Sequence, residues 1–143
     1  MRKFVLCALL LFALTVSACS VIQHRSINPT GASFSQAYEI KGFKRLVFVS
    51  GQVPEDEKEK VPPDFRSQAE LVWKNIELQL KAANMTLKDI VRFTIYLSDR
   101  KFRGESYEVR HKVLGAHEPS MTIIITGIYD SQWLLEIDAV AAK

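Results

Sequence analysis

Apolar residues recur at steps of three and four along one long segment, which predicts a helix from residue 65 to about residue 83. Asp64 follows two prolines and can cap free backbone N–H groups, and Asn84 tolerates the left-handed conformation that ends many helices. A second stripe predicts a helix at 102–114, with Gly115 just past its end. The two stripes consist of Phe65, Ala69, Val72, Ile76, Leu80 and Ala83, and of Phe102, Ser106, Val109 and Val113.

Alternating or β-branched segments predict five strands, at 35–40, 45–49, 89–97, 121–126 and 133–140. The short segment 42–44 favours a hairpin between the first two strands. The predicted order is two strands, a helix, a strand, a helix and two strands. This order indicates an α+β sandwich of two layers, with both helices on one face of a mixed sheet. The uncovered face carries apolar residues as well, so we expect self-association.

The N-terminus has the pattern of a bacterial lipoprotein signal. Arg2 and Lys3 precede an apolar run over residues 4–18, which is short for a membrane span, and small residues lead into Cys19. We expect a signal peptide at 1–18, lipid on Cys19, a flexible tether over 19–33 and a folded domain over 34–143. Ser20 resembles the sorting signal of outer-membrane lipoproteins, which implies a periplasm-facing anchor. A plain secretory signal and an uncleaved interfacial helix are the alternatives.

Composition excludes some classes of function. Without Arg2 and Lys3, 17 basic residues face 16 acidic residues, so nothing indicates a nucleic-acid surface. The three histidines lack zinc-like spacing, and Cys7 leaves with the signal, so no metal site is predicted.

Several motifs share their order and spacing with one known family. They are Phe34-Ser35-Gln36-Ala37, Phe48 to Pro54, Gln68-Ala69 with Asn75, Asp89-Ile90-Val91 followed by Thr94 to Leu97, and Leu135 to Val140. On these motifs, residues 33–142 resemble the Rid family, the reactive intermediate deaminases. The resemblance implies a chorismate-mutase-like fold and a homotrimer with clefts between subunits. Active members release ammonia from imines or enamines with water and use no metal or cofactor; an Arg binds the substrate carboxylate, and a Glu orients the water.

The resemblance also assigns site residues. It places Glu136 at the catalytic glutamate and assigns to the ligand-binding cleft Phe34, Ser50, Gly51, Ser106, Met121 and Thr122. Met121 stands where the family has its carboxylate-binding Arg, and Phe34 where it has Tyr. Losing a charge-assisted pair costs about 1.5–3 kcal/mol, so we expect an acidic, partly apolar cleft that favours neutral or cationic amphipathic ligands. Glu136 as a solvated strand residue, Met121 as core and Ser50 with Gly51 as a plain strand end remain open.

Three functions compete on this sequence. The first is a lipid-anchored trimeric module that binds a small molecule without turnover. The second is an enzyme, either a deaminase that uses another cation such as Arg92 or a hydrolase that acts through Glu136. The third is a structural lipoprotein, in which three anchors increase membrane avidity and present a surface to a partner.

Overall fold

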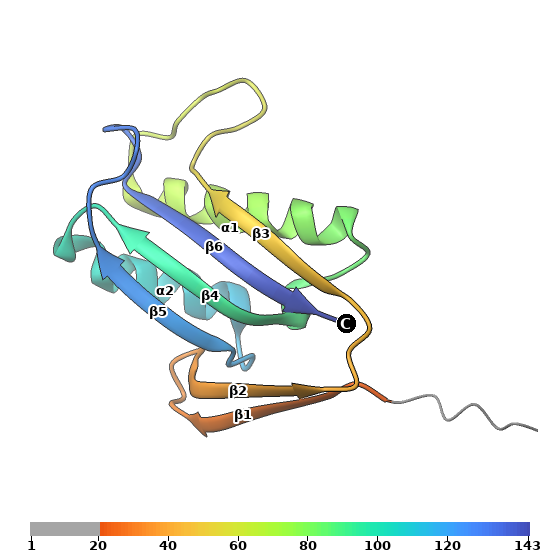
Figure 1. Cartoon of the computed structure of the whole chain (residues 1–143). Coiled ribbons are helices and arrows are strands. Elements are labelled where there is room, and N and C mark those ends of the chain that lie inside the picture. The colour runs from red at the N-terminus through yellow and green to blue at the C-terminus, as the bar shows by residue number, and fades with distance from the viewer. Residues whose placement is uncertain (1–20) are drawn as a thin grey trace, which may run out of the picture.

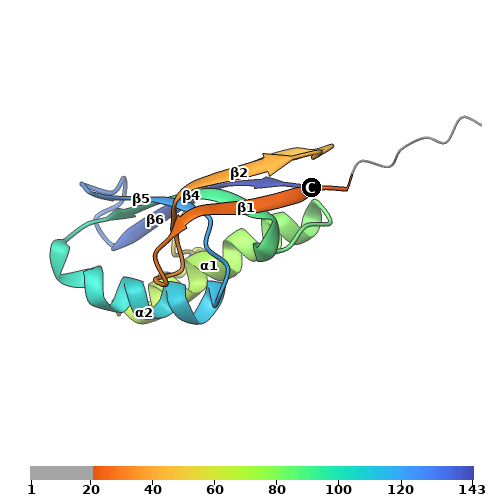
Figure 2. The ribbon, with the colours of Figure 1, turned by 90° about the horizontal axis from the view of Figure 1, so that it is seen from below.

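The computed structural model describes residues 21–143, which form a six-stranded mixed sheet covered on one face by two helices (Figures 1 and 2). The strand order is β1-β2-β5-β4-β6-β3, and β5 runs parallel to β2 and β4. The predicted two-layer α+β architecture is confirmed. The elements are β1 (Gln23–Pro29), β2 (Ser35–Lys41), β3 (Leu46–Gln52), α1 (Phe65–Ala82), β4 (Ile90–Leu97), α2 (Arg103–Leu114), β5 (Ser120–Ile125) and β6 (Leu135–Ala142), with short 3₁₀ turns at Leu87–Asp89 and Arg100–Phe102.

Helix α1 begins and ends where its local signals predict. The Asp64 side chain accepts a hydrogen bond from the backbone N–H of Ser67 at 2.9 Å. Asn84 adopts a φ of 55°, and the backbone N–H of Met85 donates to the carbonyl of Leu80 at 2.8 Å, which closes the last turn. The predicted apolar stripe is buried against the sheet from Phe65 to Leu80, and its last member, Ala83, is the half-buried C-cap.

The core lies between the helices and one face of the sheet. Strand β4 contributes Phe93, Ile95 and Leu97, and strand β6 contributes Leu135 and Ile137, all essentially fully buried. Ile95 pairs with Ile137 across the two strands, so the buried faces of β4 and β6 are continuous. These are the alternations that the sequence predicts for both strands.

The predicted tether is wrong for residues 23–29, which form strand β1. This strand pairs antiparallel with β2 from Gln23 opposite Lys41 to Pro29 opposite Ser35. It is polar and mostly exposed at the edge of the sheet, so it carries no apolar period, and backbone hydrogen bonds to β2 hold it in place. The folded unit therefore begins before the predicted residue 34. The predicted signal peptide and Cys19 lie outside the described residues.

The predicted hairpin between β2 and β3 is also wrong. Strand β3 pairs with β6, whereas β2 pairs with β1 and meets β5 only at Ser35 opposite Ser120. Because β2 diverges from β5, its end crosses toward the edge that carries β3 (Figure 1). The backbone N–H groups of Lys44 and Arg45 then donate to the carbonyl of Lys143 beyond β6, in place of β2.

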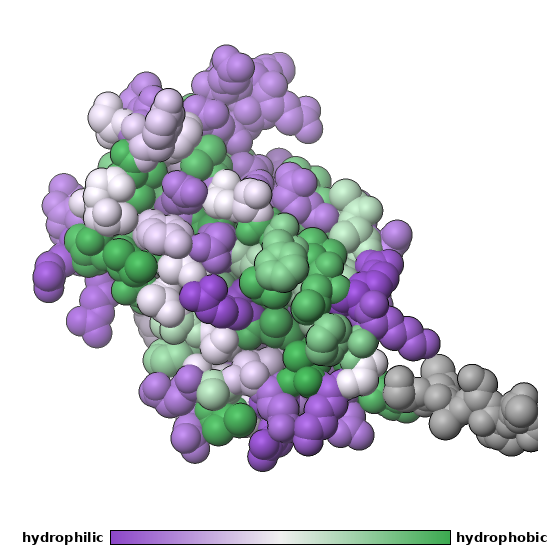
Figure 3. Space-filling view, in the orientation of Figure 1, coloured by the Kyte–Doolittle hydropathy of each residue, from purple (hydrophilic) through white to green (hydrophobic). Residues whose placement is uncertain are grey.

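The other face of the sheet carries no helix (Figure 2). Phe48 of β3 pairs with Val140 on this face, and its side chain is 76% exposed; Leu46 and Ile124 are exposed as well. Apolar side chains gather where β3 and β6 lie side by side (Figure 3). We call the whole helix-free face of the sheet the open face. Within residues 21–143, neither helix combines the length and the apolar character needed to cross a membrane.

Candidate functional site

A small cavity on the open face contains the predicted catalytic carboxylate. Glu136 pairs with Tyr96 across β6 and β4, and both line the cavity with Gly51, Asp138 and residues 126–129. The Tyr96 hydroxyl donates to Asp138 Oδ2 at 3.0 Å. This hydrogen bond, together with burial, raises the pKa of Tyr96. The open-face cavity thus places two carboxylates and two phenols, those of Tyr96 and Tyr129, around one hollow.

Gly51 permits the close approach of Glu136 to strand β3. A Cβ at position 51 would lie 1.7 Å from Oε1 of Glu136, a distance at which the carboxylate must move. The glycine therefore makes room for a neighbouring side chain, and its backbone conformation does not itself favour glycine.

Replacing Gly51 by Ala is expected to displace the Glu136 carboxylate while leaving the fold intact, because the clashing atom is the end of a flexible side chain. The ¹³C chemical shift of the Glu136 carboxyl group measures this displacement. Gly104→Ala is the matched control, since a Cβ there meets nothing within 4 Å. An unchanged Glu136 resonance in Gly51→Ala would show that the predicted contact is wrong.

A second cavity, of about 530 Å³, lies between α2 and β5, and we call it the α2–β5 cavity. Phe34 and Met121, both predicted cleft residues, line it. Its complete lining is Ala32, Phe34, Arg103, Gly104, Tyr107, Arg110, Met121 and Ile123. The turn before β2 closes one side, where Nη2 of Arg110 donates to the carbonyl of Ala32 at 3.0 Å.

The sheet register separates Met121 from Glu136. Met121 pairs with Phe93, whose side chain faces the helices, while Glu136 pairs with Tyr96 on the open face. Residues that the resemblance assigns to one cleft therefore lie in two cavities of a single subunit. The charged side chains beside Met121 are Arg103 and Arg110, so the expected acidic character is not found around Met121 within one subunit.

The remaining predicted cleft residues line neither cavity. Ser106 is only 4% exposed, because it lies on the buried side of α2, and Gly104 lines the α2–β5 cavity in its place. Thr122 pairs with Thr94 on the open face, and Ser50 is an exposed neighbour of Gly51.

The lining residues that sequence reasoning missed include Tyr96, Asp138, Arg103, Tyr107 and Arg110. The spacing of the last three, at i, i+4 and i+7, places them on one side of α2 and was visible in the sequence. Among residues 21–143, no group of three or more His, Cys, Asp or Glu side chains is arranged to hold a metal ion.

The chain matches a known protein family over most of its length. The family model described as endoribonuclease L-PSP matches residues 25–143, which include most of β1. The chain belongs to this family. Its relatives carry the Rid and RutC names, which confirms the Rid resemblance.

Individual Rid-family relatives cover most of the chain. A RutC family protein of Pyrococcus horikoshii is 32% identical over 112 residues, which are 77% of this chain and 86% of the relative. TdcF of Escherichia coli, a candidate reactive intermediate deaminase, is 26% identical over 102 residues, which are 68% of this chain and 79% of TdcF.

Solved structures agree with this assignment. The Rid protein YyfB of Yersinia pestis has a TM-score of 0.74 at 23% identity, covering 84% of this chain and 98% of YyfB. The structure of Escherichia coli TdcF with bound serine has a TM-score of 0.65 at 25% identity, covering 77% of this chain and 87% of TdcF. The Rid fold of the chain therefore follows from both sequence and structure.

Proposed function

We propose that this Rid-family chain is a membrane-anchored homotrimer that binds a small ligand in clefts between subunits and does not act as a 2-imino-acid deaminase. The observation that carries the proposal is the placement of Met121 and Glu136 on opposite faces of the sheet. Residues that the resemblance assigns to one cleft face opposite sides of the sheet in one subunit, so a shared cleft requires a second subunit to supply the other half.

The open face supports assembly. Phe48, Leu46 and Ile124 leave apolar surface in water in a single subunit, and Rid proteins typically assemble as homotrimers. Burial of this surface between subunits would also place the open-face cavity at the subunit junction. A cleft built from both cavities is the expected result.

The identity of residue 121 argues against deamination of small imino acids. By the resemblance, Met121 occupies the position of the Arg that binds the substrate carboxylate, and Phe34 replaces the usual Tyr. A thioether offers no charge-assisted hydrogen bond to a carboxylate. The proposed export of the chain from the cytosol strengthens this argument. The enzymes that make 2-aminoacrylate act in the cytosol, so a periplasmic protein would rarely meet that short-lived compound.

The N-terminal sequence supports attachment to the bacterial envelope, with the outer membrane facing the periplasm as the proposed site. Strand β1 begins at Gln23, and only three residues separate it from Cys19. A fully extended segment of this length spans about 14 Å. Lipid on Cys19 would therefore hold the folded domain close to the membrane surface.

An imine or enamine deaminase that acts through Glu136 is the second candidate, favoured by the Tyr96–Asp138 hydrogen bond beside Glu136 in the open-face cavity. Ammonia release from freshly generated 2-aminoacrylate separates the two candidates. The binding protein is expected to release ammonia no faster than the uncatalysed reaction, and a clear acceleration would overturn the proposal. A purely structural lipoprotein predicts no thermal stabilisation by any small molecule.

Introducing Arg at position 121 is expected to raise the affinity for small 2-keto acids by about tenfold or more, because a guanidinium adds a charge-assisted hydrogen bond in the α2–β5 cavity. Calorimetric titration with pyruvate measures the change. Met121→Leu is the matched control, since it keeps the apolar volume without the charge. Equal pyruvate affinities in wild type and Met121→Arg would show that residue 121 does not reach the ligand.

A further inference from the structure

Arg110 is a buried cation with most of its hydrogen-bonding capacity unused. Its side chain is 3% exposed, and its one hydrogen bond among the described residues runs from Nη2 to the carbonyl of Ala32. Its buried Nε–H has no hydrogen-bond partner among the described residues. Because a guanidinium carries five N–H donors, this side chain can still bind an acceptor.

No carboxylate of residues 21–143 lies within ion-pair distance of Arg110. The Tyr107 ring, 5.4 Å from the guanidinium carbon, is the aromatic face that it contacts. Burial accordingly lowers the pKa of Arg110, since desolvation disfavours its charged form. An unpaired charge at such a site is costly and is expected to have a partner.

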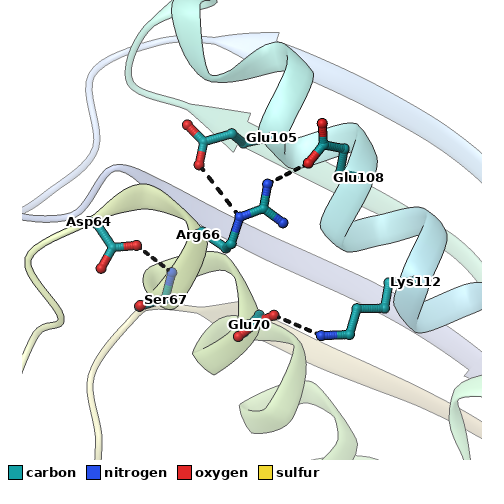
Figure 4. A network of polar contacts seen from close by, with 7 residues as sticks. All are labelled: Asp64, Arg66, Ser67, Glu70, Glu105, Glu108 and Lys112. Atoms are coloured by element: carbon teal, nitrogen blue, oxygen red, sulfur yellow. Dashed lines mark hydrogen bonds and ion pairs between the residues drawn. The ribbon is translucent and has the colours of Figure 1, made fainter.

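The acidic residues of α2 do not face the α2–β5 cavity. Glu105 and Glu108 point toward α1, where both approach Arg66 (Figure 4). Arg103 and Arg110 lie on the other side of α2, at the α2–β5 cavity. The helix thus directs its carboxylates away from the cavity and two guanidinium groups toward it.

The rest of the cavity wall is largely apolar. Phe34, Met121 and Ile123 supply its surface from β5 and from the residue before β2, and Ala32 adds a methyl group. Arg103 is exposed near the start of α2. The cavity therefore combines an apolar wall with a buried cation and a second, solvated one.

We propose that the α2–β5 cavity binds an amphipathic anion, whose charged group accepts hydrogen bonds from Arg110 and whose apolar part packs on Phe34, Met121 and Ile123. Arg103 contributes a longer-range attraction. This inference rests on the proposed ligand-binding function and gives its ligand class. It replaces the preference for neutral or cationic ligands that the sequence indicates, because the charges beside Met121 are positive.

Three benzene derivatives of similar size and different charge test the inference: benzoate, benzamide and benzylamine. Titration calorimetry of the full-length protein in a non-ionic detergent is expected to give the order benzoate, benzamide, benzylamine from tightest to weakest. Replacing Arg110 by Met should weaken benzoate binding about ten- to hundredfold and leave benzamide nearly unchanged. Arg103→Gln should weaken benzoate binding by a smaller factor. Arg66 lies in α1, on the side of α2 away from the cavity, so Arg66→Gln should leave benzoate binding unchanged.

The outcomes separate this inference from the function on which it rests. Benzamide or benzylamine binding as tightly as benzoate would overturn the anion preference and leave ligand binding standing. Absence of binding by all three probes would count against both. If Arg110→Met fails to fold, Arg110→Lys and Arg103→Gln decide the question, because Lys keeps the buried charge without the planar guanidinium fork and Gln removes only the exposed charge; unchanged benzoate affinity in both would refute the inference.

Discussion

Replacing Cys19 by Ala is expected to abolish fatty-acid labelling of the protein in bacteria. The wild-type chain should incorporate an alkyne fatty acid and lose residues 1–18, because its signal ends in small residues before a cysteine. Several acyl chains on one residue anchor a protein stably, whereas one chain binds a membrane only marginally. In-gel detection of the alkyne label, with the intact mass of the purified protein, measures both steps.

Cys7→Ala is the matched control for this prediction. Cys7 lies inside the predicted signal peptide, so its removal should leave labelling and mature mass unchanged. Together the two variants assign the lipid to one thiol. Labelling that persists in Cys19→Ala, or a wild-type protein without label, would show that the chain carries a plain secretory signal or an uncleaved helix instead.

The parts of the fold that the sequence predicts are those whose signals are local. Helix α1 has its cap, its apolar stripe and its left-handed stop within one continuous segment, and all three hold in the structure. Strands β4 and β6 show their alternation without reference to any neighbour. Strand β1 has no such signal, because its stability comes from backbone pairing with β2. The β2–β3 hairpin fails because β6, almost a hundred residues later, takes β3 as its partner.

The candidate site shows the same division between local and distant causes. Alternation places Met121 and Ile123 on one face of β5, but only the register with β4 shows that Glu136 faces the other way. The spacing of Arg103 and Arg110 along α2 is a local pattern, whereas the burial of Arg110 depends on a turn 78 residues earlier. Charge at the cavity could therefore not be assigned before these segments were placed in space.

Replacing Phe48 by Asp is expected to convert the proposed trimer into monomers. Phe48 is 76% exposed in a single subunit and lies on the open face, paired with Val140. Burying a phenylalanine contributes about 1.5–3 kcal/mol, and an aspartate without a partner would add a desolvation cost at the same place. Each trimer contains three such positions, so the losses accumulate. Sedimentation equilibrium of the full-length protein in density-matched detergent measures the molecular mass.

Leu78→Asp is the control for the Phe48 variant, because Leu78 is exposed on α1 in the opposite layer and lies outside the proposed interface. It should leave the trimer intact, and both variants should keep the circular dichroism spectrum of the wild type. Loss of the open-face contact also separates the two halves of the proposed cleft. Phe48→Asp should therefore lower the affinity for any ligand that contacts both Met121 and Glu136. A trimer that survives Phe48→Asp would mean that the subunits meet elsewhere and that Met121 and Glu136 serve different sites.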